Sequence, residues 1–81
     1  ELRQEQRLYA IQESEDNYKI IQMQLAYSRK SLQQLEMAFQ EGGVAAAVVT
    51  RIQDEVALTE LELIRAKYNI IINRELLRLL D

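Results

Sequence analysis

Two adjacent glycines near the middle of the chain constrain the fold more than any other feature. Gly42 and Gly43 are the only glycines among 81 residues, and the chain contains no proline. Glycine readily adopts the left-handed backbone conformation that commonly closes a helix, so Gly42 can end a first helix and Gly43 can open a second. Because neither arm contains another helix breaker, the sequence predicts two long helices joined by a tight turn, an αα-hairpin.

We therefore expect an all-α fold, a single antiparallel coiled-coil hairpin over residues 1–81. The ascending helix is predicted at residues 1–41, the turn at 42–44 and the descending helix at 45–81. At 1.5 Å per residue, each helix would be roughly 55 to 60 Å long. A hairpin of this shape has no room for an enclosed pocket.

A seven-residue repeat of mostly apolar side chains runs through both arms and predicts the seam between them. In the first arm the repeat and its intermediate positions are Ile11, Tyr18, Ile21, Leu25, Ser28, Leu32, Leu35 and Phe39. In the second arm they are Val49, Ile52, Val56, Thr59, Leu63, Ala66, Ile70, Asn73, Leu77 and Leu80. Pairing the two stripes makes an antiparallel coiled coil. Asn73 lies on the second stripe, where a buried amide typically fixes the pairing register at a cost in stability.

Both arms have more large apolar side chains than one seam requires. The first arm adds Tyr9, Ile20, Met23, Tyr27 and Met37, and the second adds Leu58, Leu61, Ile64, Tyr68, Ile71, Ile72, Leu76 and Leu79. Leaving those of the second arm in water would forgo on the order of 10 kcal/mol. We therefore expect this arm to pack laterally on other helices, with contacts at Leu61, Ile64, Tyr68 and Ile72. The same surplus also fits a hairpin that associates only with itself, as a four-helix bundle.

Composition and charge argue against several classes of function. The net charge is −3 and both signs are spread along the arms, so no basic stripe is present to hold a nucleic acid or an anionic membrane surface. The chain has no cysteine and no histidine, and we expect no metal and no cofactor. No apolar stretch reaches the ~20 residues of a membrane-spanning helix. Its carboxylates have no cleft to shift their pKa values, so we expect no enzymatic activity.

Two segments are similar to the coiled-coil repeat of the TolC-like outer-membrane efflux proteins. Residues 39–49, Phe-Gln-Glu-Gly-Gly-Val-Ala-Ala-Ala-Val-Val, resemble that family's turn, in which an aromatic residue, a glycine and small residues precede an apolar pair. Residues 68–73, Tyr-Asn-Ile-Ile-Ile-Asn, and the leucines that follow resemble the Tyr-Asn and Asn-x-x-Leu pattern of its descending helix. The resemblance extends from about Leu25 to Asp81.

This resemblance implies a function in transport. The family's proteins are trimers with a β-barrel in the outer membrane and a periplasmic tunnel of long helices. The chain would be one tunnel hairpin, packed on neighbouring hairpins and without direct membrane contact. Its tip would dock a periplasmic adaptor protein that joins the channel to an inner-membrane pump. The resemblance assigns this docking to Gly42, Gly43, Val44, Ala45, Ala46 and Ala47.

One position departs from the family's pattern. Many relatives place an aspartate soon after the tip, where polar links hold the tunnel shut, whereas this chain has Val48. Arg51, Asp54 and Glu55 are the remaining candidates for a gate or for polar links between hairpins. The same charges also fit the solvated flank of a coiled coil, where each pair contributes ~0 to 1 kcal/mol.

Two other functions share this sequence pattern. The hairpin of a periplasmic membrane fusion (adaptor) protein also has a small-residue tip, but it usually shows an arginine and a leucine before the turn and a serine after it. This chain has Phe39 and residues 45–49 at those places. A coiled-coil scaffold module unrelated to transport would show the same heptads.

Overall fold

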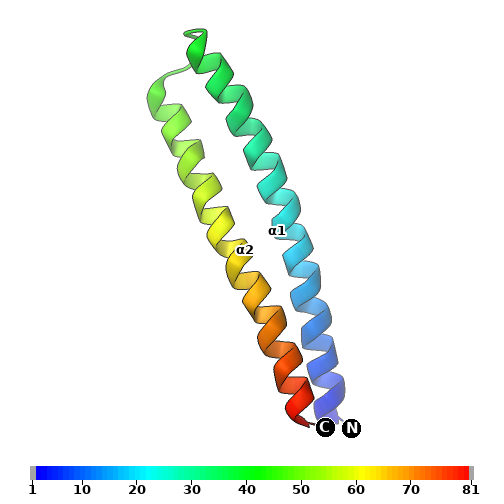
Figure 1. The fold of residues 1–81 in the computed structure, drawn as a ribbon. Helices are drawn as coiled ribbons and strands as arrows, with labels where there is room; N and C mark the ends of the chain where they lie inside the picture. The colour runs from blue at the N-terminus through cyan, green and yellow to red at the C-terminus, as the bar shows by residue number, and fades with distance from the viewer. Residues whose placement is uncertain (1, 81) are drawn as a thin grey trace.

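The chain folds into two long helices that pack side by side in opposite directions (Figure 1). The structure is a computed structural model, and it describes residues 2–80. Helix α1 spans Leu2–Gln40 and helix α2 spans Ala46–Leu80. The hairpin measures 61 × 14 × 12 Å, and the two helix ends remote from the turn lie together (Figure 1). The prediction of an all-α hairpin is confirmed.

The segment that links the helices covers residues 41–45, whereas the sequence predicted residues 42–44. Residues 1 and 81, which the predicted helix ranges included, lie outside the described residues.

The first helix ends in a Schellman motif formed by the two glycines. Gly42 has a φ of 81°, in the left-handed region. Its N–H donates to the carbonyl of Phe39 at 2.9 Å, and the N–H of Gly43 donates to the carbonyl of Ala38 at 2.8 Å. These two bonds satisfy carbonyl groups at the helix end. Gly43 thus completes the cap of α1, and the expectation that it opens the second helix is wrong, since α2 begins at Ala46.

The core is a single thin seam between the helices. Its five buried residues are Ile21, Leu25, Val49, Val56 and Ala66, and all five belong to the predicted repeat. The other predicted seam residues are half-buried, with two exceptions at the ends of the hairpin. Leu80 is 38% exposed and Phe39 is 45% exposed.

Phe39 therefore does not belong to the buried seam, contrary to the heptad prediction. It lies in the last turn of α1, beside the linking segment and the start of α2. Ala45 and Ala46, which follow the turn, carry single methyl groups and offer little surface to cover an aromatic ring. The heptad repeat fixes the direction of a side chain, but burial also needs a partner of sufficient size.

Replacing Gly42 with alanine tests the cap. Its Cβ would meet no atom within 4 Å, so the cost arises from the left-handed backbone alone. We expect the free energy of unfolding to fall by about 1 kcal/mol, measured by urea denaturation at one protein concentration. Gly43→Ala is the matched control, because its Cβ would lie at ordinary contact distance, 3.4 Å, from the Ala38 carbonyl oxygen. Equal losses in the two variants would contradict this account of the turn.

Candidate interaction surfaces

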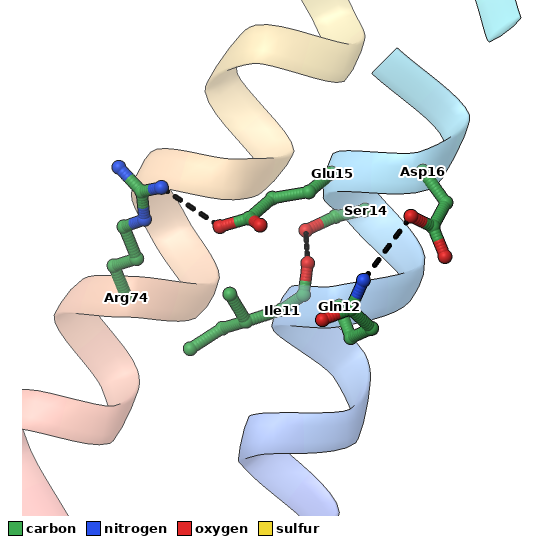
Figure 2. Close-up of polar contacts among 6 residues, drawn as sticks. All are labelled: Ile11, Gln12, Ser14, Glu15, Asp16 and Arg74. Carbon is green, nitrogen blue, oxygen red and sulfur yellow. Dashed lines mark hydrogen bonds and ion pairs between the residues drawn. The ribbon is translucent and has the colours of Figure 1, made fainter. Parts of the chain in front are cut away.

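Ion pairs across the seam fix how the helices are aligned. The Nη2 atom of Arg29 lies 3.2 Å from Oε1 of Glu60. The Nη2 atom of Arg74 lies 2.8 Å from Oε1 of Glu15, and Figure 2 shows this pair bridging the two helices. All four side chains are a third or more exposed, so each pair contributes about 0 to 1 kcal/mol. These pairs add little to the stability of the hairpin, but they show which parts of α1 and α2 lie side by side.

Asn73, the polar residue of the predicted seam, has a partner that the sequence did not reveal. Nη1 of Arg7 donates a hydrogen bond of 3.3 Å to Oδ1 of Asn73, and both residues are half-buried. In two antiparallel helices, residues at the same height have residue numbers with a constant sum. This sum is 80 for Arg7 and Asn73, and it is 89 for each of the two ion pairs across the seam. Residues of α1 and α2 whose numbers add to between 80 and 89 therefore lie at similar heights, a range of nine residues or roughly 13 to 14 Å along the helix.

The second helix exposes an apolar face on the side turned away from α1. The four residues predicted for lateral contact are all exposed, at 44% for Leu61, 52% for Ile64, 59% for Tyr68 and 54% for Ile72. Their spacing of three and four residues places them on one side of the helix. We term this the outer face of α2, and over four turns it consists of Ala57, Leu58, Leu61, Ile64, Arg65, Tyr68 and Ile72, with Ile71 at its edge, where it also borders a hollow between the two helices. Arg65 is its only charged residue.

The corresponding side of α1 mixes apolar and charged residues. We term it the outer face of α1, and it consists of Tyr9, Glu13, Asp16, Ile20, Met23, Tyr27, Lys30, Gln34 and Met37. In Figure 2, Glu15 points toward Arg74 of α2, whereas Asp16 lies on the other side of α1 and accepts a 3.1 Å hydrogen bond from Gln12. A shallow hollow on this face is lined by Tyr9, Gln12, Glu13, Asp16, Asn17 and Ile20.

The hairpin exposes more surface than a compact protein of its size. Its accessible area is 6306 Å². A folded monomer of 9.5 kDa typically exposes about 5,000 Å². The difference, on the order of 1,300 Å², exceeds the ~800 Å² that one partner contributes to a standard protein interface. The exposed faces are thus large enough for stable contacts with other helices.

The tip is small and largely exposed. Of the six residues predicted for docking, Gly42, Gly43, Ala45, Ala46 and Ala47 are exposed and Val44 is half-buried. The first turn of α2 is closed by a 3.1 Å bond from the N–H of Val48 to the carbonyl of Ala45. Within residues 42–47 the exposed side chains are no larger than a methyl group, so another protein segment can approach this part of the backbone closely.

The candidate polar residues near the tip do not form a cluster within one hairpin. Arg51, Asp54 and Glu55 are all exposed on the first turns of α2. Within residues 2–80, none of their side chains forms an ion pair. Arg51 and Asp54 lie three residues apart, at the tip end of the outer face of α2. Their charges are available to a neighbouring molecule.

Over the described part of the chain, no group of acidic residues is arranged to hold a metal ion. Within the same residues, neither helix is apolar enough over a sufficient length to cross a membrane. Comparisons with protein-family models, curated proteins and solved structures found no match to this chain.

Asn73→Leu tests whether the amide in the seam lowers the stability of the hairpin while it fixes the alignment of the two helices. We expect the free energy of unfolding to rise by about 1 kcal/mol, because leucine contributes apolar burial and Arg7, only half-buried, can still reach water. Asn69→Leu is the matched control on the exposed side of the same helix, where the change should stay within ~0.5 kcal/mol. Urea denaturation at one protein concentration measures both. A loss of stability in Asn73→Leu would show that the Arg7 bond itself stabilises the hairpin.

Proposed function

We propose that this chain is a lateral building block of a wall of helices, namely a tunnel hairpin of a trimeric outer-membrane efflux or secretion channel. One observation carries the general part of the proposal: α2 has apolar side chains both on the seam and on its outer face. An amphipathic helix normally packs each apolar stripe against protein, and α2 has two such stripes on opposite sides. The hairpin covers only one of these sides, so the other requires a second packing partner.

The specific part of the proposal, a TolC-like channel, rests on the sequence resemblance of the tip and of residues 68–73. The comparisons add no support to it. An elongated hairpin with a small-residue tip has the form that a tunnel wall needs, and on this proposal it lies in the periplasm of a Gram-negative bacterium. Its partners are neighbouring hairpins, a periplasmic adaptor and an inner-membrane pump. The hairpin itself takes part in no chemical reaction.

In this function the hairpin acts through its geometry. Lateral packing of the outer faces holds neighbouring hairpins together and closes the tunnel near the tips. Docking of an adaptor on residues 42–47 would favour a splayed arrangement over the closed one, which is a change between two packings. Arg51 and Asp54 lie near that end, where polar links between hairpins would contribute to the closed state.

Polar substitutions on the outer face of α2 test the lateral contact. We expect the 81-residue chain to associate reversibly, and the triple variant Leu61→Gln, Tyr68→Gln, Ile72→Gln to be monomeric, because it loses most of the apolar area available to a partner. Sedimentation equilibrium over a range of concentrations measures the change. The matched control is Gln22→Ala, Gln53→Ala, Lys67→Ala, three exposed positions on the flank that carries the ion pairs. A wild-type chain that stays monomeric would refute the proposal.

A bulky residue at the tip tests the channel itself. In cells that make the full-length protein, we expect Ala46→Trp to raise the accumulation of a fluorescent efflux substrate, because the indole prevents close approach of the adaptor. Gln53→Trp, on an exposed flank of the same helix, should leave accumulation unchanged. Unchanged efflux in the Ala46 variant would contradict docking at the tip. Recovery of the protein from the cytoplasm would contradict the transport function altogether.

A further inference from the structure

The flank of the hairpin that carries the ion pairs also contains a hollow between the two helices. It lies beside the pair of Glu15 and Arg74 that Figure 2 shows bridging α1 and α2. Its volume is about 390 Å³, within the range of pockets that bind small molecules, and it is open to solvent. We term it the flank hollow, and beside that ion pair it is lined by Tyr18, Lys19, Gln22, Lys67, Ile70 and Ile71.

The floor of the flank hollow is apolar. Tyr18 and Ile70 are half-buried, and Ile71 is 49% exposed. These side chains come from both helices and leave apolar surface in contact with water. Covering this surface with an apolar group is therefore favourable.

Two lysines border this floor, one from each helix. Lys19 and Lys67 are both exposed, and within residues 2–80 neither forms an ion pair. Arg74 is already paired with Glu15. The flank hollow thus carries two uncompensated positive charges, although the chain as a whole has a net charge of −3. A negative group placed between the helices at this point is attracted by both lysines.

The flank hollow interrupts a regular row of ion pairs. Glu15 pairs with Arg74 and Arg29 with Glu60, and the residue numbers of each pair add to 89. Midway between them, the same alignment brings position 22 opposite position 67, and the residues there are a glutamine and a lysine that both line the hollow. An acidic residue at position 22 would complete the row, as flanking charges do in coiled coils. Without it, the lysine at position 67 is left for a negative group from outside the hairpin.

We propose that the flank hollow binds a small amphiphilic anion, in which a carboxylate, sulfonate or phosphate group is attached to an apolar body. The negative group lies between Lys19 and Lys67, and the apolar body lies on the floor. Gln22 is exposed at the same place, and its Nε2 can donate a further hydrogen bond to the negative group. Charge-assisted hydrogen bonds of this kind fix the orientation of a ligand on an apolar surface.

The length of the floor favours a small molecule over a segment of another protein. The two ion pairs bound it at either end, and Glu15 and Arg29 are 14 residues apart, about 21 Å along the helix. A partner helix laid along this flank would cover both ion pairs and remove them from water, which is costly. A small molecule between them leaves both pairs hydrated.

This binding is independent of the proposed channel. The proposed lateral contacts use the outer faces of α1 and α2, whereas the flank hollow lies between those faces. Neighbouring hairpins packed in that way leave the hollow accessible to dissolved molecules. The binding is therefore compatible with lateral packing and does not require it.

Replacing both lysines tests the site. The probe is anilinonaphthalene sulfonate, a fluorescent amphiphilic anion, titrated into the wild-type chain and into the variant Leu61→Gln, Tyr68→Gln, Ile72→Gln, which lacks the other large apolar surface open to the dye. We expect Lys19→Gln, Lys67→Gln to lower the association constant about tenfold in both backgrounds, because two charge contacts are lost. Phenylnaphthylamine has the same rings without the sulfonate, and its binding should not depend on the lysines.

Lys30→Gln, Arg51→Gln is the matched control. It removes the same charge at two exposed positions that do not line the flank hollow. We expect it to change the affinity for the sulfonate dye by less than about twofold, because salt screens charges that are not adjacent to the ligand. Raising the ionic strength should weaken dye binding to the wild-type chain more than to the lysine variant. Far-ultraviolet circular dichroism verifies that the exposed substitutions leave the helices intact.

Each outcome decides the inference. Loss of dye affinity in the Lys19, Lys67 variant alone supports it, whether or not the wild-type chain associates with itself, so its failure is distinguishable from that of the proposed function. Unchanged affinity in this variant overturns it, and so does an equal loss in the control, which would show an effect of net charge only. If the wild-type chain self-associates without dye and the lysine variant does not, acidic groups of a second copy occupy the hollow, which also overturns the inference.

Discussion

The rest of the structure depends on one interaction, the apolar seam between two antiparallel helices. The Schellman motif at Gly42 and Gly43 reverses the chain within five residues, which brings the two heptad stripes together. Contacts along the seam then set which stretches of the two helices lie side by side. Because a seam of two helices buries only one side of each, the hairpin leaves its outer faces without a partner. The functional question posed by this fold is which surface covers them.

The two outer faces are not equivalent, and the difference has a consequence for assembly. On α2 the face is nearly all apolar over four turns, and Arg65 is its one charged residue. On α1 it mixes apolar side chains with three acidic or basic groups along its length, at Glu13, Asp16 and Lys30. A surface that covers the outer face of α2 meets mostly apolar side chains, whereas one that covers the outer face of α1 also meets charged groups of both signs.

The heptad pattern predicted toward which side of its helix each side chain points, but it did not predict all of the contacts that the side chains make. Heptad spacing correctly identified the five buried residues and the exposed residues of α2, because the helical period alone decides which side of a helix a residue occupies. The bond between Arg7 and Asn73 was not predictable, since it depends on the relative height of residues far apart in the chain. Phe39 was mispredicted as a seam residue because a place in the heptad repeat does not by itself supply a side chain to cover the ring. Gly43 was predicted to lie in the turn, as it does, but its part in capping α1 was not foreseen because glycine can either close one helix or open the next.

Stability and selectivity come from different residues in the proposed wall. An exposed ion pair contributes only about 0 to 1 kcal/mol, while apolar side chains such as Leu61 and Tyr68 contribute about 1.5 to 3 kcal/mol each when fully buried. In such a wall the apolar residues would hold neighbouring hairpins together, and charged residues such as Arg51 and Asp54 would add selectivity rather than strength. Apolar contact has little directional preference, so hairpins can tilt or slide while remaining associated. A wall held in this way can loosen at the tips, where the polar links lie, without coming apart along its length.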